Sequence, residues 1–310
     1  MAELKLEVAR PAICAPSRLA TFGCSHKKLS LKSRRKAADD LLDVVMPQKG
    51  GFTAMLQAYF DESERNDGTF AVAGFAYNKV QAKKCRLEWD HLFENYGGCH
   101  MSELAHAQHG TGRFKGVSTT ESGRLLHQAV AIINARAKFA VAVSCNIREM
   151  RGLLPKWIRG FEGAYPVCCH IAMTAMGDLV GHHEEIAYFF ESGHAHQKYA
   201  HKFMSRVLDV PDLKDSYRHY SHTFASDQDV TQLQTADLLA WEWTKYWDET
   251  AMKRERKMRK SLAALLTKGS MTVGDYDTKR VMVTHITGVP LKNFCEQVAK
   301  LGFLQLEELE

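Results

Sequence analysis

The sequence feature that most restricts the fold is a hairpin signal in residues 56–77. An apolar run begins at Leu56 and reaches the acidic residue Asp61, and its alternation predicts a strand with these two residues on opposite faces. Asn-Asp-Gly at 66–68 follows. Its glycine accepts a positive φ at no steric cost, so a second strand over 69–77 can fold back on the first. A carboxylate at the end of a buried strand is costly unless a positive group meets it. We expect that group to be a divalent metal ion.

The composition is typical of a protein with a sizeable core. The chain has 310 residues, of which 45% are hydrophobic and 25% are charged, and this balance argues against a disordered chain. No run of about 18 or more apolar residues occurs, so we expect no membrane-spanning helix. The first residues lack a compact apolar segment, so we expect no secretory signal.

Cysteine usage indicates a reducing compartment. The eight cysteines are scattered and include no Cys-x-x-Cys pair, which argues against a small disulfide-linked scaffold. They are Cys14, Cys24, Cys85, Cys99, Cys145, Cys168, Cys169 and Cys295. We therefore predict free thiols and a cytoplasmic protein.

The basic charge is confined to the start of the chain. Residues 1–54 hold 10 Lys and Arg against 5 Asp and Glu, whereas residues 55–310 hold 31 of each. We predict that residues 1–54 are a basic, disordered leader in which only 37–45 could form a short helix, with Met55 as an alternative biological start. We expect one domain over residues 55–250. A basic segment and a helix over 251–310 should pack on the same domain.

The remaining patterns predict alternating helices and strands. Periodic apolar residues predict helices over 79–96, 118–136, 163–182, 196–208 and 230–247, with Ser118 and Asp229 as N-caps of two of them. Runs rich in β-formers predict strands over 139–147, 186–191 and 217–225. A further short strand is expected near 281–283, and Pro290 opens a C-terminal helix. A hairpin followed by such units predicts an α/β fold with a mixed sheet flanked by helices.

Two further carboxylates occupy positions where a charge is costly. Glu191 ends an apolar run that is typical of an interior strand, and the ends of such strands face the ligand crevice. Asp237 lies in a largely apolar stripe of a predicted helix. Brought together with Asp61, these groups would repel, since one like-charged pair at about 4 Å costs roughly 4 kcal/mol at an effective dielectric of about 20. Mg²⁺ or Mn²⁺ would convert that repulsion into binding.

Four motifs occur in order along the chain. They are Tyr-Phe-Asp-Glu-Ser at 59–63, His-Met-Ser-Glu-Leu at 100–104, Phe-Glu-Ser-Gly at 190–193 and Gln-Leu-Gln-Thr-Ala-Asp-Leu-Leu-Ala at 232–240. With these motifs, the sequence from about Met55 to Trp247 resembles the domain-of-unknown-function 3800 family. The resemblance implies an RNase H-like fold, which here would carry an N-terminal extension and a C-terminal helical addition. It also implies acidic metal ligands, and in this sequence they are Asp61, Glu191 and Asp237.

Such a site suits two-metal hydrolysis, in which ions about 3.5–4 Å apart bind the attacking and leaving oxygens of a phosphodiester. We expect Asp61 to bridge both ions, while Glu191 and Asp237 hold one each. Supporting roles are expected for five residues: Glu62 or Glu103 as a fourth ligand, His100 or His194 as a proton carrier, and Gln234 as the group that orients Asp237. The expected function is a Mg²⁺- or Mn²⁺-dependent nuclease that acts on DNA or RNA.

Other interpretations of the same residues stay open. Asp61 and Glu62 could cap a turn, Asp237 could pair with a buried Arg or His, and Glu191 could make a structural turn contact. Histidines at 182, 183, 194, 196 and 201 suggest zinc, although no His-Glu-x-x-His motif or zinc-spaced cysteine pair occurs. The basic run at 253–260 could contact phosphates or form a solvated helix face. The rival function is a catalytically inactive module that binds nucleic acid or protein.

Overall fold

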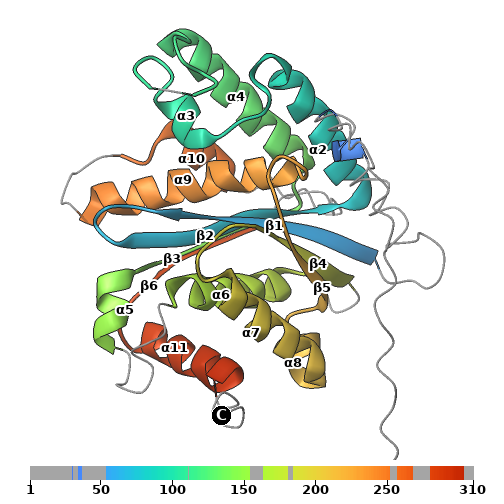
Figure 1. Ribbon diagram of the computed structural model, residues 1–310, viewed down its shortest axis with the longest axis vertical. Helices are drawn as coiled ribbons and strands as arrows, with labels where there is room; N and C mark the ends of the chain where they lie inside the picture. Colours follow the sequence, from blue (N-terminus) through green and yellow to red (C-terminus); the bar gives the residue numbers. More distant parts are fainter. Residues whose placement is uncertain are drawn as a thin grey trace, which may run out of the picture.

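A mixed six-stranded sheet forms the centre of the fold (Figure 1). The computed structural model describes residues 30, 34–36, 54–110, 112–153, 163–180, 184–251, 257–267 and 280–303. The strand order is β5-β4-β1-β2-β3-β6. The strands are β1 (Ala54–Glu64), β2 (Thr69–Asn78), β3 (Phe139–Asn146), β4 (Glu184–Glu191), β5 (His219–Ala225) and β6 (Arg280–Ile286).

Strand directions divide the sheet into an antiparallel part and a parallel part. Strands β1, β2 and β3 form an antiparallel meander. On the other side of β1, β4 pairs with β1 and β5 pairs with β4, both in parallel. Strand β6 pairs with β3, also in parallel. The predicted α/β fold with a mixed sheet flanked by helices is therefore confirmed.

Helices cover both faces of the sheet (Figure 1). Above it in this view lie α2 (Lys79–Leu92), α3 (Met101–Ala105), α4 (Thr119–Arg136), α9 (Gln232–Ala251) and α10 (Lys260–Leu266). Below it lie α5 (Ile147–Leu153), α6 (Ala164–Leu179), α7 (Gln197–Asp209), α8 (Pro211–Ser216) and α11 (Gly288–Phe303). A short 3-10 helix, η1 (Glu94–Tyr96), follows α2.

Alternation along the central strands sends side chains into two separate cores. On β1, Leu56 and Phe60 join the core on the α6 face, whereas Tyr59 joins the core on the α9 face. On β4, Tyr188 and Phe190 face α6, and Phe189 faces α9. Both strands are thus covered on both faces, which explains why the run before Glu191 is continuously apolar.

The predicted hairpin is confirmed. Gly68 has a φ of +89°, a conformation that favours glycine. The turn carboxylate is Asp67, whose Oδ1 accepts a hydrogen bond from the Thr69 N–H at 2.8 Å. The register places Asp61 opposite Ala73 on β2. Asp61 therefore lies within the paired part of β1 and not in the turn.

The sequence pattern located the long elements and missed the short ones. Helix α4 begins as predicted, because the Ser118 Oγ accepts a hydrogen bond from the Glu121 N–H at 3.2 Å. Helices α3, α5, α8 and α10 were not predicted, since one or two turns are too short to show a period. The C-terminal addition is more than helical, because β6 extends the sheet beside β3.

One part of the expected leader is attached to the body of the protein. Residues 34–36 form a helical turn in which Arg35 is 4% exposed. The Arg35 guanidinium forms an ion pair with Asp90 and donates from Nε to the Gln228 carbonyl oxygen at 3.1 Å. Arg34 pairs with Asp229 at 2.5 Å, so Asp229 is engaged there and not as the expected N-cap. Apart from Ser30 and Ala54, the rest of the predicted leader, including 37–45, lies outside the described residues.

Two expectations concern the environment of the protein. In the part of the chain that the structure describes, no helix combines the length and the apolar character needed to cross a membrane. The six cysteines within that part are all free and buried: Cys85, Cys99, Cys145, Cys168, Cys169 and Cys295. Cys14 and Cys24 lie outside it. The cytoplasmic location stays a prediction.

Candidate metal centre

Two parallel strand ends bring Asp61 and Glu191 together. Strands β1 and β4 run in parallel with Phe60 opposite Phe190, so the next residue on each strand is an acid. Both acids follow residues of the α6 face and therefore point toward α9. Asp61 is 5% exposed, and its carboxyl group is in hydrogen-bonding contact with that of Glu191.

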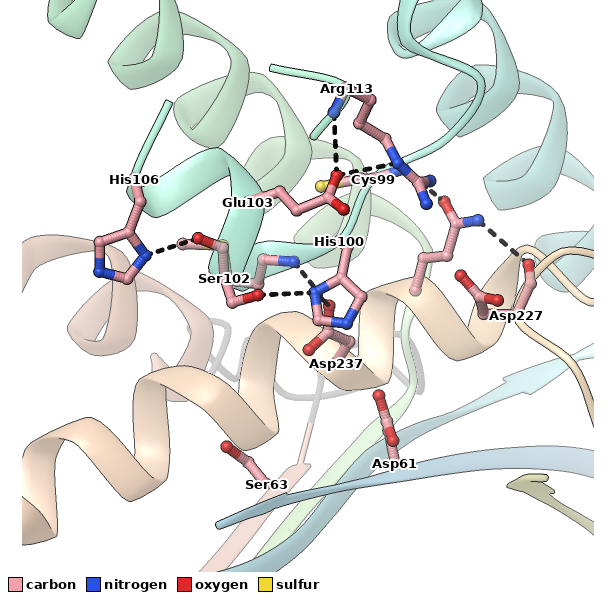
Figure 2. A network of polar contacts seen from close by, with 12 residues as sticks. Asp61, Ser63, Cys99, His100, Ser102, Glu103, His106, Arg113, Asp227 and Asp237 are labelled. Carbon is pink, nitrogen blue, oxygen red and sulfur yellow. Dashed lines mark hydrogen bonds and ion pairs between the residues drawn. The ribbon is translucent and has the colours of Figure 1, made fainter. Parts of the chain in front are cut away.

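Helix α9 lies across β1 and β2 and supplies the third acid (Figure 2). Figure 2 shows the Asp237 carboxylate beside His100, while Asp61 points up from β1 toward α9. The Met101 N–H donates to the Asp237 Oδ2 at 2.6 Å, and the His100 Nδ1 lies 3.6 Å from the same oxygen. The structure therefore brings Asp61, Glu191 and Asp237 into one cluster, with His100 at its edge.

The electrostatics of this cluster show that negative charge is crowded. Burial, the contact with Glu191 and the charges of Asp237, Glu191 and Glu62 raise the pKa of Asp61 well above its usual value. Burial raises the pKa of Asp237 to about 6, against the opposing effects of His100 and the Met101 N–H. The charged groups that act on Asp61 are Asp237, Glu191 and Glu62, and all three are carboxyl groups.

Glu62 belongs to the same crowded region but follows Asp61 on the opposite face of β1. Burial and the charge of Glu191 raise the pKa of Glu62 to about 8. Its Oε2 is buried and has no hydrogen-bonding partner among the described residues. Its neighbours include Cys169 and Tyr165 on α6. Glu62 is therefore close to the cluster and faces the α6 core.

Gln234 does not bond to Asp237, contrary to the expectation that it orients this residue. The Gln234 Oε1 accepts hydrogen bonds from the Trp89 Nε1–H and the Cys99 N–H, both at 2.9 Å. The Gln234 Nε2 donates to the Asp227 carbonyl oxygen at 3.1 Å. Gln234 thus holds the 97–101 segment on α9, and through that segment it sets the position of the Met101 N–H.

Gly98 lets this segment approach α9 closely. Its φ is +115°, and a Cβ added there would lie 2.8 Å from the Gln234 Nε2. A side chain at this position would therefore meet both backbone strain and a clash. In the sequence this position is only the second of two adjacent glycines, a pattern that does not reveal the contact with α9.

Glu103 is paired elsewhere and does not extend the carboxylate cluster. Its Oε2 lies 3.0 Å from the Arg113 Nε and accepts a hydrogen bond from the Arg113 N–H at 3.3 Å. Figure 2 shows this pair above α3, on the side away from Asp61. In this structure Glu103 holds the 112–116 segment through Arg113, and it is not a fourth ligand.

His194 lies on the other side of the sheet from Asp237. Its ring stacks on Tyr165 with 4.1 Å between the ring centroids and packs edge-on against Phe70, and both partners belong to the α6 core. Burial, with a smaller effect of the charge on His196, lowers the pKa of His194 to about 4. His194 is therefore a neutral aromatic wall and not a proton carrier for Asp237.

Two of the structural alternatives can be compared with these contacts. The hairpin turn is capped by Asp67, so Asp61 and Glu62 do not serve that purpose. Among the described residues, the Asp237 carboxylate contacts the Met101 N–H and His100, so its side-chain partner is a half-exposed histidine and not a buried arginine or histidine. A purely structural role for Asp61 would leave the cost of burying its charge without an opposing positive charge, because the groups that act on it are acids.

The donor atoms suit a hard divalent cation, although their arrangement is not yet that of a bound site. Carboxylate oxygens are the ligands that Mg²⁺ and Mn²⁺ prefer. Within the described residues, no three or more His, Cys, Asp or Glu side chains are arranged so that they could hold a metal ion. Side-chain rotation of Asp61, Glu191 and Asp237 would therefore have to accompany binding. The same finding gives the zinc alternative no support within these residues, and His182 and His183 lie outside them.

Known proteins provide no independent assignment. No family model, no curated protein and no solved structure matches this chain.

Proposed function

We propose that this protein is a Mg²⁺- or Mn²⁺-dependent nuclease that hydrolyses phosphodiester bonds of DNA or RNA. The observation that carries the proposal is the meeting of Asp61, Glu191 and Asp237 from two strand ends and one helix. Buried carboxyl groups that repel one another are costly without a counter-charge. A divalent cation is the partner that their chemistry fits.

The strand order supports the RNase H-like assignment that the motifs imply. A three-stranded antiparallel meander with two parallel strands on the other side of β1 is the arrangement of an RNase H-like sheet, and β6 is an addition to it. The resemblance implies acidic residues on the first strand, on a later strand and on the last core helix. Here those positions are on β1, β4 and α9.

The roles of the residues follow from their positions. Asp61, between Glu191 and Asp237, would bridge two ions, and its two neighbours would hold one each. When bound, such ions activate a water nucleophile and neutralise the charge on the leaving oxygen. The Met101 N–H fixes one oxygen of Asp237 and leaves the other free for an ion. His100, half exposed and 3.6 Å from Asp237, can carry a proton between the site and solvent.

Cationic side chains next to the cluster favour a polyanionic substrate. The Arg65 guanidinium lies 5.5 Å from the Trp241 ring centroid, and the Arg259 guanidinium lies 4.8 Å from it. Trp241 is one turn beyond Asp237 on α9, and Arg65 lies four residues beyond Asp61. Both guanidinium groups lie against the indole, and each also faces an acid: Asp248 lies 3.8 Å from Arg65 and Glu242 lies 3.5 Å from Arg259. In this position they can meet phosphates on either side of the cleaved bond.

A catalytically inactive nucleic-acid or protein-binding module is the second candidate. The observation that favours it is the absence, among the described side chains, of a three-group arrangement ready to hold a metal. Such a module would bind its ligand without turnover. Its affinity would also survive neutralisation of the carboxylates.

Cleavage assays separate the two candidates. Labelled single-stranded and duplex DNA and RNA are incubated with Mg²⁺ or Mn²⁺ and with wild-type protein, Asp61→Asn or Asp237→Asn. We expect cleavage by the wild type and at least a 100-fold loss in each variant, because several kcal/mol of charge stabilisation disappear with a ligand. Asp212→Asn, an exposed acid of α8, is the matched control and should cleave normally. Equal activity in all four proteins would remove these residues from the mechanism.

A further inference from the structure

A cavity lies on the α6 side of the sheet, near the ends of β1 and β4 that carry Asp61 and Glu191. Its volume is about 230 Å³. Glu64 at the end of β1 and His194 after β4 form part of its wall. Glu64 is three residues beyond Asp61, and His194 is three residues beyond Glu191. Two residues of the cavity lining are therefore only three positions along the chain from proposed metal ligands.

The lining of the cavity is aromatic at its base and polar at its rim. The rings of Tyr165 and His194 stack with an interplanar angle of 18°, and Phe70 packs edge-on against both. Arg151 is exposed at the rim and makes no ion pair within the described residues. Tyr165 and Phe70 are only 1% and 2% exposed, so His194 is the ring of this stack that is most open to a ligand, and Glu64 and Arg151 supply charged groups in the same lining.

Tyr165 connects the cavity to the carboxylates. The residue is 1% exposed, and its hydroxyl group is buried beside the Cys169 thiol, with no stronger hydrogen-bonding partner among the described residues. The charges of Glu62 and Asp61 both act on this hydroxyl. The ring of Tyr165 therefore lines the cavity while its polar end faces the cluster, and only the end of the sheet separates the two sites.

We propose that this cavity binds one unpaired nucleobase of the strand whose phosphodiester lies at the carboxylates. The proposal rests on the nuclease function proposed above and names its substrate class: single-stranded nucleic acid, or a strand with a splayed end. Stacking on aromatic side chains is how proteins hold unpaired bases, and every base offers a ring face. Arg151 would meet the backbone phosphate that follows this base.

The size of the cavity agrees with this ligand. Pockets for drug-sized molecules measure about 300–1,000 Å³, so about 230 Å³ suits a single heteroaromatic ring system. His194 stays neutral at physiological pH because burial lowers its pKa to about 4, and a neutral ring presents no charge to the base. A base in a duplex is stacked and paired, and it would have to leave the helix to enter.

The test measures binding of a fluorescein-labelled single-stranded oligonucleotide by anisotropy in EDTA, where no turnover occurs. A series of strands carries one abasic site at successive positions. We expect one position at which the abasic site weakens binding by roughly 5- to 150-fold, which is the range for one stacked base. His194→Leu should weaken binding of the intact strand by a similar factor and remove the difference between intact and abasic strands.

Controls keep the outcome independent of folding. His194→Phe preserves a stacking ring and should bind as the wild type does. His127→Leu, an exposed histidine of α4, should also be unchanged. If His194→Leu fails to fold, the abasic series on wild-type protein still decides the question. Equal affinity for every abasic strand, tighter binding of the matched duplex, or no binding of single strands would overturn the proposal.

The nuclease proposal and the base cavity can fail separately. Position-specific loss in the abasic series without any cleavage in Mg²⁺ or Mn²⁺ would retain the cavity and reject the nuclease. Cleavage by the wild type that ignores every abasic position would reject the cavity and retain the nuclease.

Discussion

At the scale of single residues, the main unfavourable feature is the crowding of negatively charged side chains around Asp61. Asp61 is 5% exposed, the Asp237 side chain is 13% exposed, and Glu191 contacts Asp61. An acid whose pKa is higher in the folded than in the unfolded state destabilises the fold once pH rises above the unfolded value. Protonation removes this cost, and a bound cation would offset it at neutral pH.

The variant Asp237→Asn should make the metal-free protein more stable. The pKa of Asp237 rises from 3.8 to about 6 on folding, so its charge costs at most about 3 kcal/mol above pH 6. Urea unfolding in EDTA should show little gain at pH 4 and the full gain at pH 7, because the cost appears as pH rises from about 4 to about 6. Equal stability of variant and wild type at both pH values would show that Asp237 carries no such penalty.

Much of the candidate site could be predicted because buried acids are conspicuous in apolar segments. Asp61, Glu191 and Asp237 stood out in the sequence for this reason, and the structure brings them together. Contacts made by backbone groups or by distant side chains could not be predicted in the same way. The Met101 N–H on Asp237 and the Arg113 partner of Glu103 depend on how separate loops fold over α9.

At the scale of the elements, one glutamine joins α9 to the loop before α3. The Gln234 Oε1 is the shared acceptor for the Trp89 and Cys99 N–H groups, and all three residues are buried. The loop in turn places His100 and the Met101 N–H on Asp237. A residue that touches no proposed metal ligand therefore determines the geometry around one.

The variant Gln234→Leu should loosen this loop. Two buried donors would lose their acceptor, and each unpaired donor costs about 1–3 kcal/mol, so we expect a loss of roughly 2–6 kcal/mol in urea unfolding. Hydrogen exchange at the Met101 amide should become faster. Gln128→Leu, on the surface of α4, is the control and should change neither quantity. Unchanged exchange at Met101 in Gln234→Leu would show that the loop is held by other contacts.

At the scale of the whole molecule, both ends of the chain contribute to the body of the fold. Strand β6 pairs with β3, and Arg35 enters a polar slot beside α2 and the segment that precedes α9. The amphipathic periods of the long helices and the hairpin signal were sufficient to predict the central layers. The attachment of Arg35 could not be predicted, because a basic cluster in a polar segment shows no period and its acceptors lie far away in the sequence.

Removal of the leader should therefore not be neutral, contrary to the expectation for a disordered extension. Arg35→Ala removes one buried partner of Asp90, which keeps Arg86 at 3.2 Å and the Thr231 hydroxyl at 3.0 Å, and should cost about 1–3 kcal/mol. Arg34→Ala is the matched control, since Arg34 and Asp229 are both more than a third exposed and such pairs contribute about 0–1 kcal/mol. Chemical unfolding of the two variants measures the difference, and equal losses would contradict the buried role of Arg35.

Stability should also fall on acidification because histidine is buried in neutral form. His170 is 4% exposed, with its Nδ1 2.6 Å from the Tyr217 hydroxyl, and burial lowers its pKa from 6.5 to about 4. The unfolded chain takes up a proton first, so about 3 kcal/mol is lost as pH falls from 6.5 to 4. Urea unfolding of His170→Gln should show a smaller pH dependence than the wild type. An identical pH dependence in the two proteins would contradict this prediction.

The central claim is that Asp61, Glu191 and Asp237 gather around a divalent cation. A crystal structure of the full chain grown in Mn²⁺, with anomalous diffraction recorded at the manganese edge, tests it most directly. The account predicts a strong anomalous peak within coordination distance of Asp61 and of at least one of the other two carboxylates, with their side chains rotated toward it. Manganese bound elsewhere in the crystal while this position stays without a peak would contradict it.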